Sequence, residues 1–186
     1  MPHAPRFLLA AALAVAMPLS ASAADYVQAA GSSLAFAGKY QGEVFTGTFP
    51  DFRTTLAFDP ADLSSAKLEV AIPIATATTR NDDYDSEMRG ASFFDAGRFA
   101  QATYTATRFR DLGNGRYAAD GELALRGVRK PVTLTFTWTP GTRPLLSGRA
   151  TVRRLDFGVG GGEWADTGTI PDEIAVATRV YLKPAN

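Results

Sequence analysis

The most conspicuous candidates for chemistry are carboxylates crowded into one short stretch near the middle of the chain. Asp82, Asp83, Asp85 and Glu87 suggest a calcium loop. An EF-hand loop needs carboxylates at its first, third and fifth positions and glycine at its sixth. Counted from Asp83, the sixth position is Met88, so the spacing does not fit. The carboxylates instead suit the first turn of a short, solvated helix.

A second group of candidates is the glycine-rich stretch 158–162, followed directly by the carboxylates Glu163 and Asp166. The glycines resemble those of a phosphate-binding loop, but GKS or GKT is missing and no helix follows, so we reject that interpretation. Glu163 and Asp166 leave open a carboxylate-dependent hydrolase or isomerase that acts on a lipid-like substrate. Such an enzyme would need carboxyl groups with shifted pKa values, which a sequence does not show.

Residues 1–23 have the pattern of a secretory signal peptide. An apolar run from Phe7 to Met17, too short to span a bilayer, precedes the small-residue cleavage site 21–23. We therefore expect an exported domain at residues 24–186. Export removes His3, the only histidine, and the chain has no cysteine. Ser-His-Asp and Cys-His catalysis and His- or thiolate-based metal sites are thereby excluded, so we expect a protein that is not an enzyme.

The charge balance narrows the choice of partners. The chain carries 19 basic and 19 acidic residues, whereas a nucleic-acid-binding domain needs a basic excess. We therefore expect no nucleic-acid partner, and no motif indicates a metal or a cofactor.

The third group of candidates is a large apolar and aromatic set. Most of its members would be core in any all-β protein, and periodicity alone does not distinguish a filled core from a lined cavity. If a cavity exists, the residues expected to line it and bind a ligand are Phe36, Phe45, Phe49, Phe58, Val70, Ile72, Phe93, Phe94, Tyr104, Leu125, Phe136, Trp138, Phe157 and Trp164.

Alternating apolar and polar residues predict the strands that position these groups. The hairpin at 121–138 is the clearest, with Gly127 allowing a positive φ in its turn and Pro131 closing that turn. Asn114-Gly115 is a strong signal for another hairpin turn. The predicted strands are 34–39, 44–58 (one bent strand or a pair), 67–76, 102–109, 116–125, 132–139, 146–152 and 174–182.

About eight short strands and one helix at 81–89 favour an antiparallel up-and-down barrel or a sandwich. An eight-stranded barrel is just wide enough to hold one slender ligand. An outer-membrane barrel would need an apolar outer wall, whereas the predicted outward residues include Lys67, Glu69, Glu122 and Arg126. We therefore do not expect a membrane-spanning protein.

Several short motifs follow one another in an order that resembles the YceI-like family of polyisoprenoid-binding proteins. They cover about residues 25–183, nearly all of the exported domain. The motifs are Asp59-Pro60, Phe93-Phe94-Asp95, Leu125-Arg126-Gly127-Val128 with Lys130-Pro131-Val132, Asp156-Phe157-Gly158-Val159-Gly160, and Glu163-Trp164-Ala165-Asp166.

This resemblance implies an eight-stranded, lipocalin-like β-barrel exported to the bacterial periplasm. It implies that the barrel holds a long amphiphile, such as a polyisoprenoid, an isoprenoid quinone or a fatty-amide-type lipid. Residues 160–166 resemble a subgroup found with cytochrome b561-type membrane proteins, which implies such a protein as a partner.

A barrel ligand also needs an entrance. The helix followed by Phe93-Phe94 and the loop 156–168 are the two long insertions between strands, and we expect both at one end of the barrel, gating the cavity. The glycines of the loop would let it move. Trp164 would then lie near the ligand, and Glu163 or Asp166 would contact a polar head group.

Overall fold

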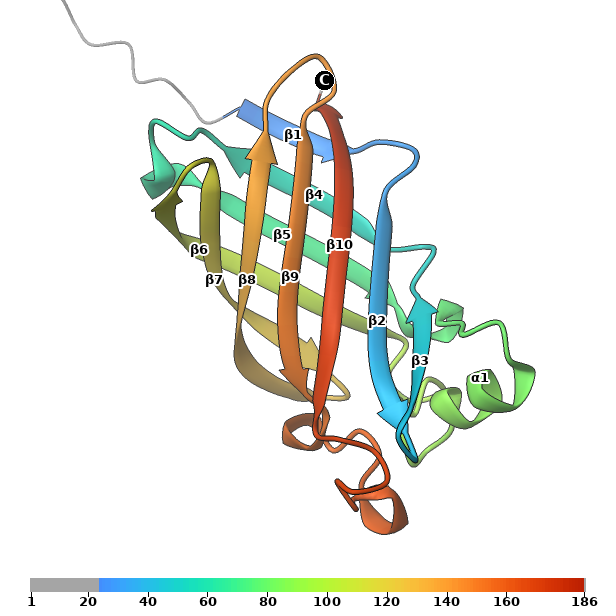
Figure 1. The fold of residues 1–186 in the computed structure, drawn as a ribbon. Helices are drawn as coiled ribbons and strands as arrows, with labels where there is room; N and C mark the ends of the chain where they lie inside the picture. The colour runs from blue at the N-terminus through green and yellow to red at the C-terminus, as the bar shows by residue number, and fades with distance from the viewer. Residues whose placement is uncertain (1–23, 186) are drawn as a thin grey trace, which may run out of the picture.

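Antiparallel strands that close on themselves form most of the computed structural model, which describes residues 24–185 (Figure 1). The predicted signal peptide, 1–23, lies outside the described residues. The strands are β1 (Ala24–Gln28), β2 (Ser33–Tyr40), β3 (Glu43–Thr48), β4 (Arg53–Phe58), β5 (Lys67–Pro73), β6 (Gln101–Gly113), β7 (Arg116–Leu125), β8 (Val128–Thr139), β9 (Leu145–Arg153) and β10 (Glu173–Pro184).

Eight strands close the barrel in the order β1-β4-β5-β6-β7-β8-β9-β10, and β10 pairs back onto β1. The β2–β3 hairpin continues the sheet from the other half of β10, through the pairs Ala175–Ala37 to Arg179–Ser33. The predicted eight-stranded antiparallel barrel is therefore confirmed. The sequence did not reveal β1. Of the two alternatives for 44–58, one bent strand or a pair, the structure has the pair, β3 and β4.

Two tight turns explain the neighbouring hairpins. In β6–β7 the turn residues Asn114 and Gly115 have φ values of 55° and 70°, and in β7–β8 Arg126 and Gly127 have 52° and 76°. A two-residue hairpin turn with positive φ at both central residues has a twist that matches the twist of the paired strands. Pro131 does not close the second turn as predicted. It lies within β8, opposite Glu122, because the turn needs only two residues.

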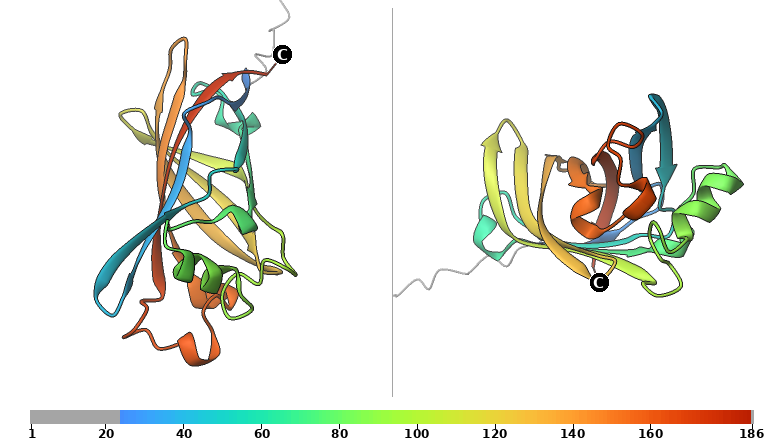
Figure 2. Two further views of the ribbon diagram at one scale, coloured as in Figure 1. Left: turned by 90° about the vertical axis from the view of Figure 1, so that its right-hand side faces the viewer. Right: turned by 90° about the horizontal axis from the view of Figure 1, so that it is seen from below.

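Short helices connect the strands. They are α1 (Asp82–Arg89) and the 3-10 turns Leu63–Ser65, Ile74–Thr76, Arg154–Phe157 and Gly162–Trp164. Asn81 caps α1, because its side-chain oxygen accepts from the backbone nitrogens of Asp83 (3.0 Å) and Tyr84 (3.2 Å). Figure 2 shows α1 and the segment between β9 and β10 at the same end of the barrel. Within residues 24–185, no helix is long and apolar enough to cross a membrane.

Aromatic rings fill part of the barrel interior. Phe58 lies at the centre, with its ring centroid 5.1 Å from those of Tyr117 and Trp138, 5.6 Å from Phe136 and 5.9 Å from Phe109. All five side chains are buried. We call these five residues the aromatic plug. Such tilted ring pairs add to the stability that burial provides.

Candidate functional site

Beside the aromatic plug, the barrel interior contains a cavity of about 410 Å³ with a predominantly apolar lining. Inward residues of β2 to β10 form its wall, and residues of α1 and of the segment 154–170 lie at its open end. Its volume falls within the range of about 300–1,000 Å³ that is typical of small-molecule pockets. The arrangement can enclose an apolar chain while leaving one end in contact with water.

The structure places ten of the fourteen predicted ligand-binding residues on the wall of this cavity. They are Phe36, Phe45, Phe49, Val70, Ile72, Phe93, Phe94, Tyr104, Leu125 and Trp164. The other four do not line it. Phe58, Phe136 and Trp138 belong to the aromatic plug, and Phe157, within the loop that follows β9, is buried in the hydrophobic core.

Sequence reasoning missed several aliphatic wall residues because it weighted aromatic side chains. Leu68 and Leu134 point into the cavity from strand faces that were predicted correctly. The alternation of apolar and polar residues that placed Val70 and Phe136 on inward faces applies equally to Leu68 and Leu134. Other missed residues of the wall are Leu34, Leu123, Leu146, Ala150, Val152, Val176 and Val180.

The two predicted gate segments lie together, as expected. The rings of Phe93 and Trp164 have centroids 5.5 Å apart, and the backbone nitrogen of Gly160 donates to the carbonyl oxygen of Ser92 over 2.8 Å. Arg126, predicted to face outward, instead bridges both segments. Its guanidinium donates to the carbonyl of Gly158 and, over 2.6 Å, to that of Ala91.

The loop after β9, residues 154–171, is organised around one buried side chain. The guanidinium of Arg154, 3 % exposed, donates to the carbonyl oxygens of Val159 (3.0 Å), Gly160 (2.6 Å), Trp164 (2.9 Å), Ile170 (2.7 Å) and Pro171 (3.2 Å). A Cβ at Gly160 would lie 2.6 Å from the Arg154 Nη1, so glycine is required there. Gly160 thus serves a close backbone approach to Arg154, and the predicted movement of the loop stays a prediction.

Glu163 and Asp166 lie on the predicted gate loop but not on the cavity wall. The Asp166 carboxylate accepts from Thr169 Oγ1 (2.7 Å) and from the backbone nitrogens of Gly168 and Thr169 (both 3.1 Å). The bond from the Thr169 hydroxyl, with those backbone bonds, lowers the pKa of Asp166. This carboxylate therefore holds a turn, and the contact of Glu163 or Asp166 with a head group stays a prediction.

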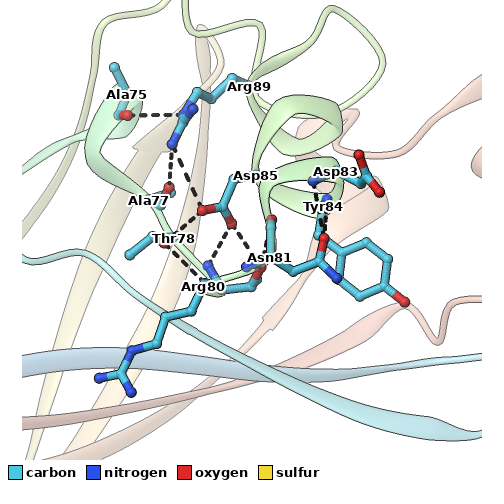
Figure 3. A network of polar contacts seen from close by, with 10 residues as sticks. Ala75, Ala77, Thr78, Arg80, Asn81, Asp83, Tyr84, Asp85 and Arg89 are labelled. Atoms are coloured by element: carbon cyan, nitrogen blue, oxygen red, sulfur yellow. Dashed lines mark hydrogen bonds and ion pairs between the residues drawn. The ribbon is translucent and has the colours of Figure 1, made fainter.

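A buried carboxylate attaches α1 to the segment that follows β5 (Figure 3). Asp85, 5 % exposed, accepts from Thr78 Oγ1 (2.6 Å), Thr79 N (2.6 Å) and Thr79 Oγ1 (2.7 Å). Arg89 lies 3.9 Å from the same carboxylate and donates to the carbonyl of Ala75 over 3.1 Å. Burial acts to raise the pKa of Asp85, but the hydrogen bonds from Thr78 and Thr79 and the charge of Arg89 outweigh it, so the pKa is lowered.

Replacing Asp85 with asparagine should destabilise the fold by about 1–3 kcal/mol at pH 7, because the amide presents donors to groups that already donate. A lowered folded-state pKa stabilises the fold above the unfolded pKa of about 3.9, and this contribution is lost as the pH falls through the folded value. Urea unfolding at pH 7 and pH 3 measures the difference between Asp85→Asn and the wild type. We expect the difference to shrink at pH 3, whereas an equal difference would contradict this role. Asp82→Asn, an exposed change on the same helix, is the control.

Comparison with known proteins agrees with the fold. The YceI-like domain family matches residues 26–182. Among curated proteins, a UPF0312 protein of Vibrio campbellii is 33% identical over 132 residues, covering 69% of this chain and 70% of the relative. A UPF0312 protein of Shewanella baltica is 33% identical over 154 residues, covering 76% of this chain and 80% of the relative.

Solved structures show the same barrel. BcnA of Burkholderia cenocepacia superimposes with a TM-score of 0.80 at 27% identity, covering 83% of this chain and 98% of BcnA. A polyisoprenoid-binding domain from Saccharophagus degradans gives a TM-score of 0.67 at 17% identity, covering 87% of this chain and 99% of that domain. The second likeness concerns the fold alone.

Proposed function

Because the chain belongs to the YceI-like family and its barrel encloses an apolar cavity, we propose that it binds and carries a long-chain amphiphile in the periplasm. The ligand class comprises polyisoprenoids, isoprenoid quinones and fatty-amide-type lipids. The observation that carries the proposal is the cavity, whose wall consists mostly of aliphatic and aromatic side chains and whose end is open to solvent. Each CH₂ group moved from water into such a wall gains about 0.8 kcal/mol.

Two polar groups on the cavity wall, Tyr104 and Arg154, fit binding rather than catalysis. The Tyr104 hydroxyl donates to the carbonyl oxygens of Ala119 (2.8 Å) and Val132 (3.1 Å), and burial raises its pKa to about 12. Tyr104 therefore stays neutral at neutral pH. Arg154, the cationic residue on the wall, is bonded to five backbone carbonyls. Both groups hold the protein together rather than presenting a free acid or base to a ligand.

The cellular part of the proposal comes from the predicted signal peptide and the family resemblance. A carrier exported to the periplasm would exchange its lipid with a membrane protein, and a cytochrome b561-type protein is the partner that the resemblance implies. Recovery of the protein in the soluble periplasmic fraction is the expected result. Retention in the membrane fraction after a salt wash would contradict it.

Solvent extraction of the purified protein followed by mass spectrometry tests the proposed function. We expect a long-chain lipid in roughly equimolar amount, or uptake of such a lipid on titration of the extracted protein. A lipid recovered unchanged after long incubation supports a carrier over the carboxylate-dependent hydrolase or isomerase. Failure both to recover and to bind any long-chain lipid would exclude the proposal.

A further inference from the structure

Three aromatic rings surround the open end of the cavity. Tyr40 from β2 lies between the other two, with ring centroids 6.3 Å from Tyr84 of α1 and 6.4 Å from Trp164. All three line the cavity, and Tyr84 is 42 % exposed, so a ligand that enters the cavity contacts these rings first. We call Tyr40, Tyr84 and Trp164 the aromatic rim.

Carboxylates accompany the aromatic rim. Asp83 and Glu87 are one turn apart on α1, both are exposed, and both line the cavity. No ion pair among the described residues involves either side chain. Glu43 pairs with Tyr40 across the β2–β3 hairpin, which places the two side chains on the same face of the sheet. The entrance therefore combines aromatic rings with exposed carboxylates.

The nearby cations keep their charge but are held in other contacts, Arg126 among them by the carbonyls of Gly158 and Ala91. Arg154 is buried and bonded to five carbonyls, and Arg89 is bonded to the carbonyls of Ala75 and Ala77 beside Asp85. Lys39 precedes Tyr40 on β2 and faces the opposite side of the sheet. Figure 3 shows the Arg80 side chain extending away from α1.

We propose that this entrance selects the ligand's head group, taking a cationic head such as a quaternary ammonium in preference to an anionic one. The inference rests on the proposed function, because the apolar chain must occupy the cavity for its head to reach the aromatic rim. A cation is attracted to the faces of tyrosine and tryptophan rings, and carboxylates nearby add to that attraction. A carboxylate or phosphate head meets like charge instead.

Three amphiphiles with the same hexadecyl chain test the selection: a trimethylammonium, an alcohol and a carboxylate. Each is titrated into delipidated protein at neutral pH, low salt and a concentration below its own aggregation limit. We expect the ammonium to bind about tenfold more tightly than the alcohol and the carboxylate more weakly than the alcohol. Added salt should reduce both differences.

Variants of the entrance residues test whether the preference for the ammonium head group arises there. The exposed double change Asp83→Asn with Glu87→Gln, and separately Tyr84→Leu, should each lower the affinity for the ammonium more than the affinity for the alcohol. Asp82→Asn, which does not line the cavity, is the matched control and should change neither. A carboxylate that binds as tightly as the ammonium, or variants that weaken all three ligands equally, would overturn the head-group selection alone. If none of the three amphiphiles binds, both the head-group selection and the proposed function are excluded.

Discussion

Replacing Ala150 with tryptophan should weaken the binding of a hexadecyl alcohol by about 100-fold or more, a loss of about 2.7 kcal/mol. Ala150 lies in the middle of β9, lines the cavity, and pairs with Val176 of β10. An indole at this position projects into the space that the chain would occupy. Because the space is empty rather than close-packed, the added side chain should avoid most of the cost of about 1–3 kcal/mol that overpacking a core carries.

The next residue supplies the control. Thr151 is exposed on the outer face of the same strand, so Thr151→Trp adds the same group outside the barrel. Titration calorimetry with wild type, Ala150→Trp and Thr151→Trp measures the affinities, and circular dichroism checks the folds. Equal affinities for the two variants would show that the chain does not occupy the cavity.

Removing the guanidinium of Arg154 should produce the largest loss of stability, about 3–5 kcal/mol for Arg154→Met. The change leaves buried carbonyl oxygens without donors, including those of Gly160, Ile170 and Trp164. Arg154→Lys should recover only part of the loss, because an ammonium has three donors and lacks the planar guanidinium. Denaturant unfolding measures both variants.

Arg153 provides a matched comparison. It is an exposed neighbour whose guanidinium pairs with Asp172 over 2.9 Å. Exposed ion pairs of this kind contribute at most about 1 kcal/mol, so Arg153→Met should unfold close to the wild type. If Arg154→Met were no less stable than Arg153→Met, the loop 154–171 would not depend on the buried guanidinium.

The wall of the barrel was predictable because the alternation of inward and outward residues has a single period along each strand. β7 was predicted at its observed bounds, and Leu123, Leu134 and Phe136 are buried as their pattern indicated. The turn at Asn114-Gly115 was equally clear, because few residue pairs adopt two positive φ values readily. β1 carried no such signal, since its five residues include Asp25 and Gln28.

The division of the interior between cavity and plug was not predictable from the sequence. Phe36 and Phe58 both lie on inward faces, yet Phe36 lines the cavity and Phe58 packs among plug rings contributed by three other strands. That difference depends on which strands meet at a given height of the barrel. The burial of Arg154 was not predictable either. Arginine side chains are mostly exposed, and only the folded structure shows that the surrounding chain covers this one.

A crystal structure with a long-chain alcohol that carries bromine at the far end of its chain shows whether the ligand lies inside the barrel, because anomalous scattering locates the bromine without prior assumptions about the ligand. We expect a single bromine peak inside the barrel, between Leu68, Leu134 and Leu146, with the hydroxyl end near Tyr40 and Trp164. A bromine peak only on the outer surface of the sheet, with the cavity empty, would contradict this expectation.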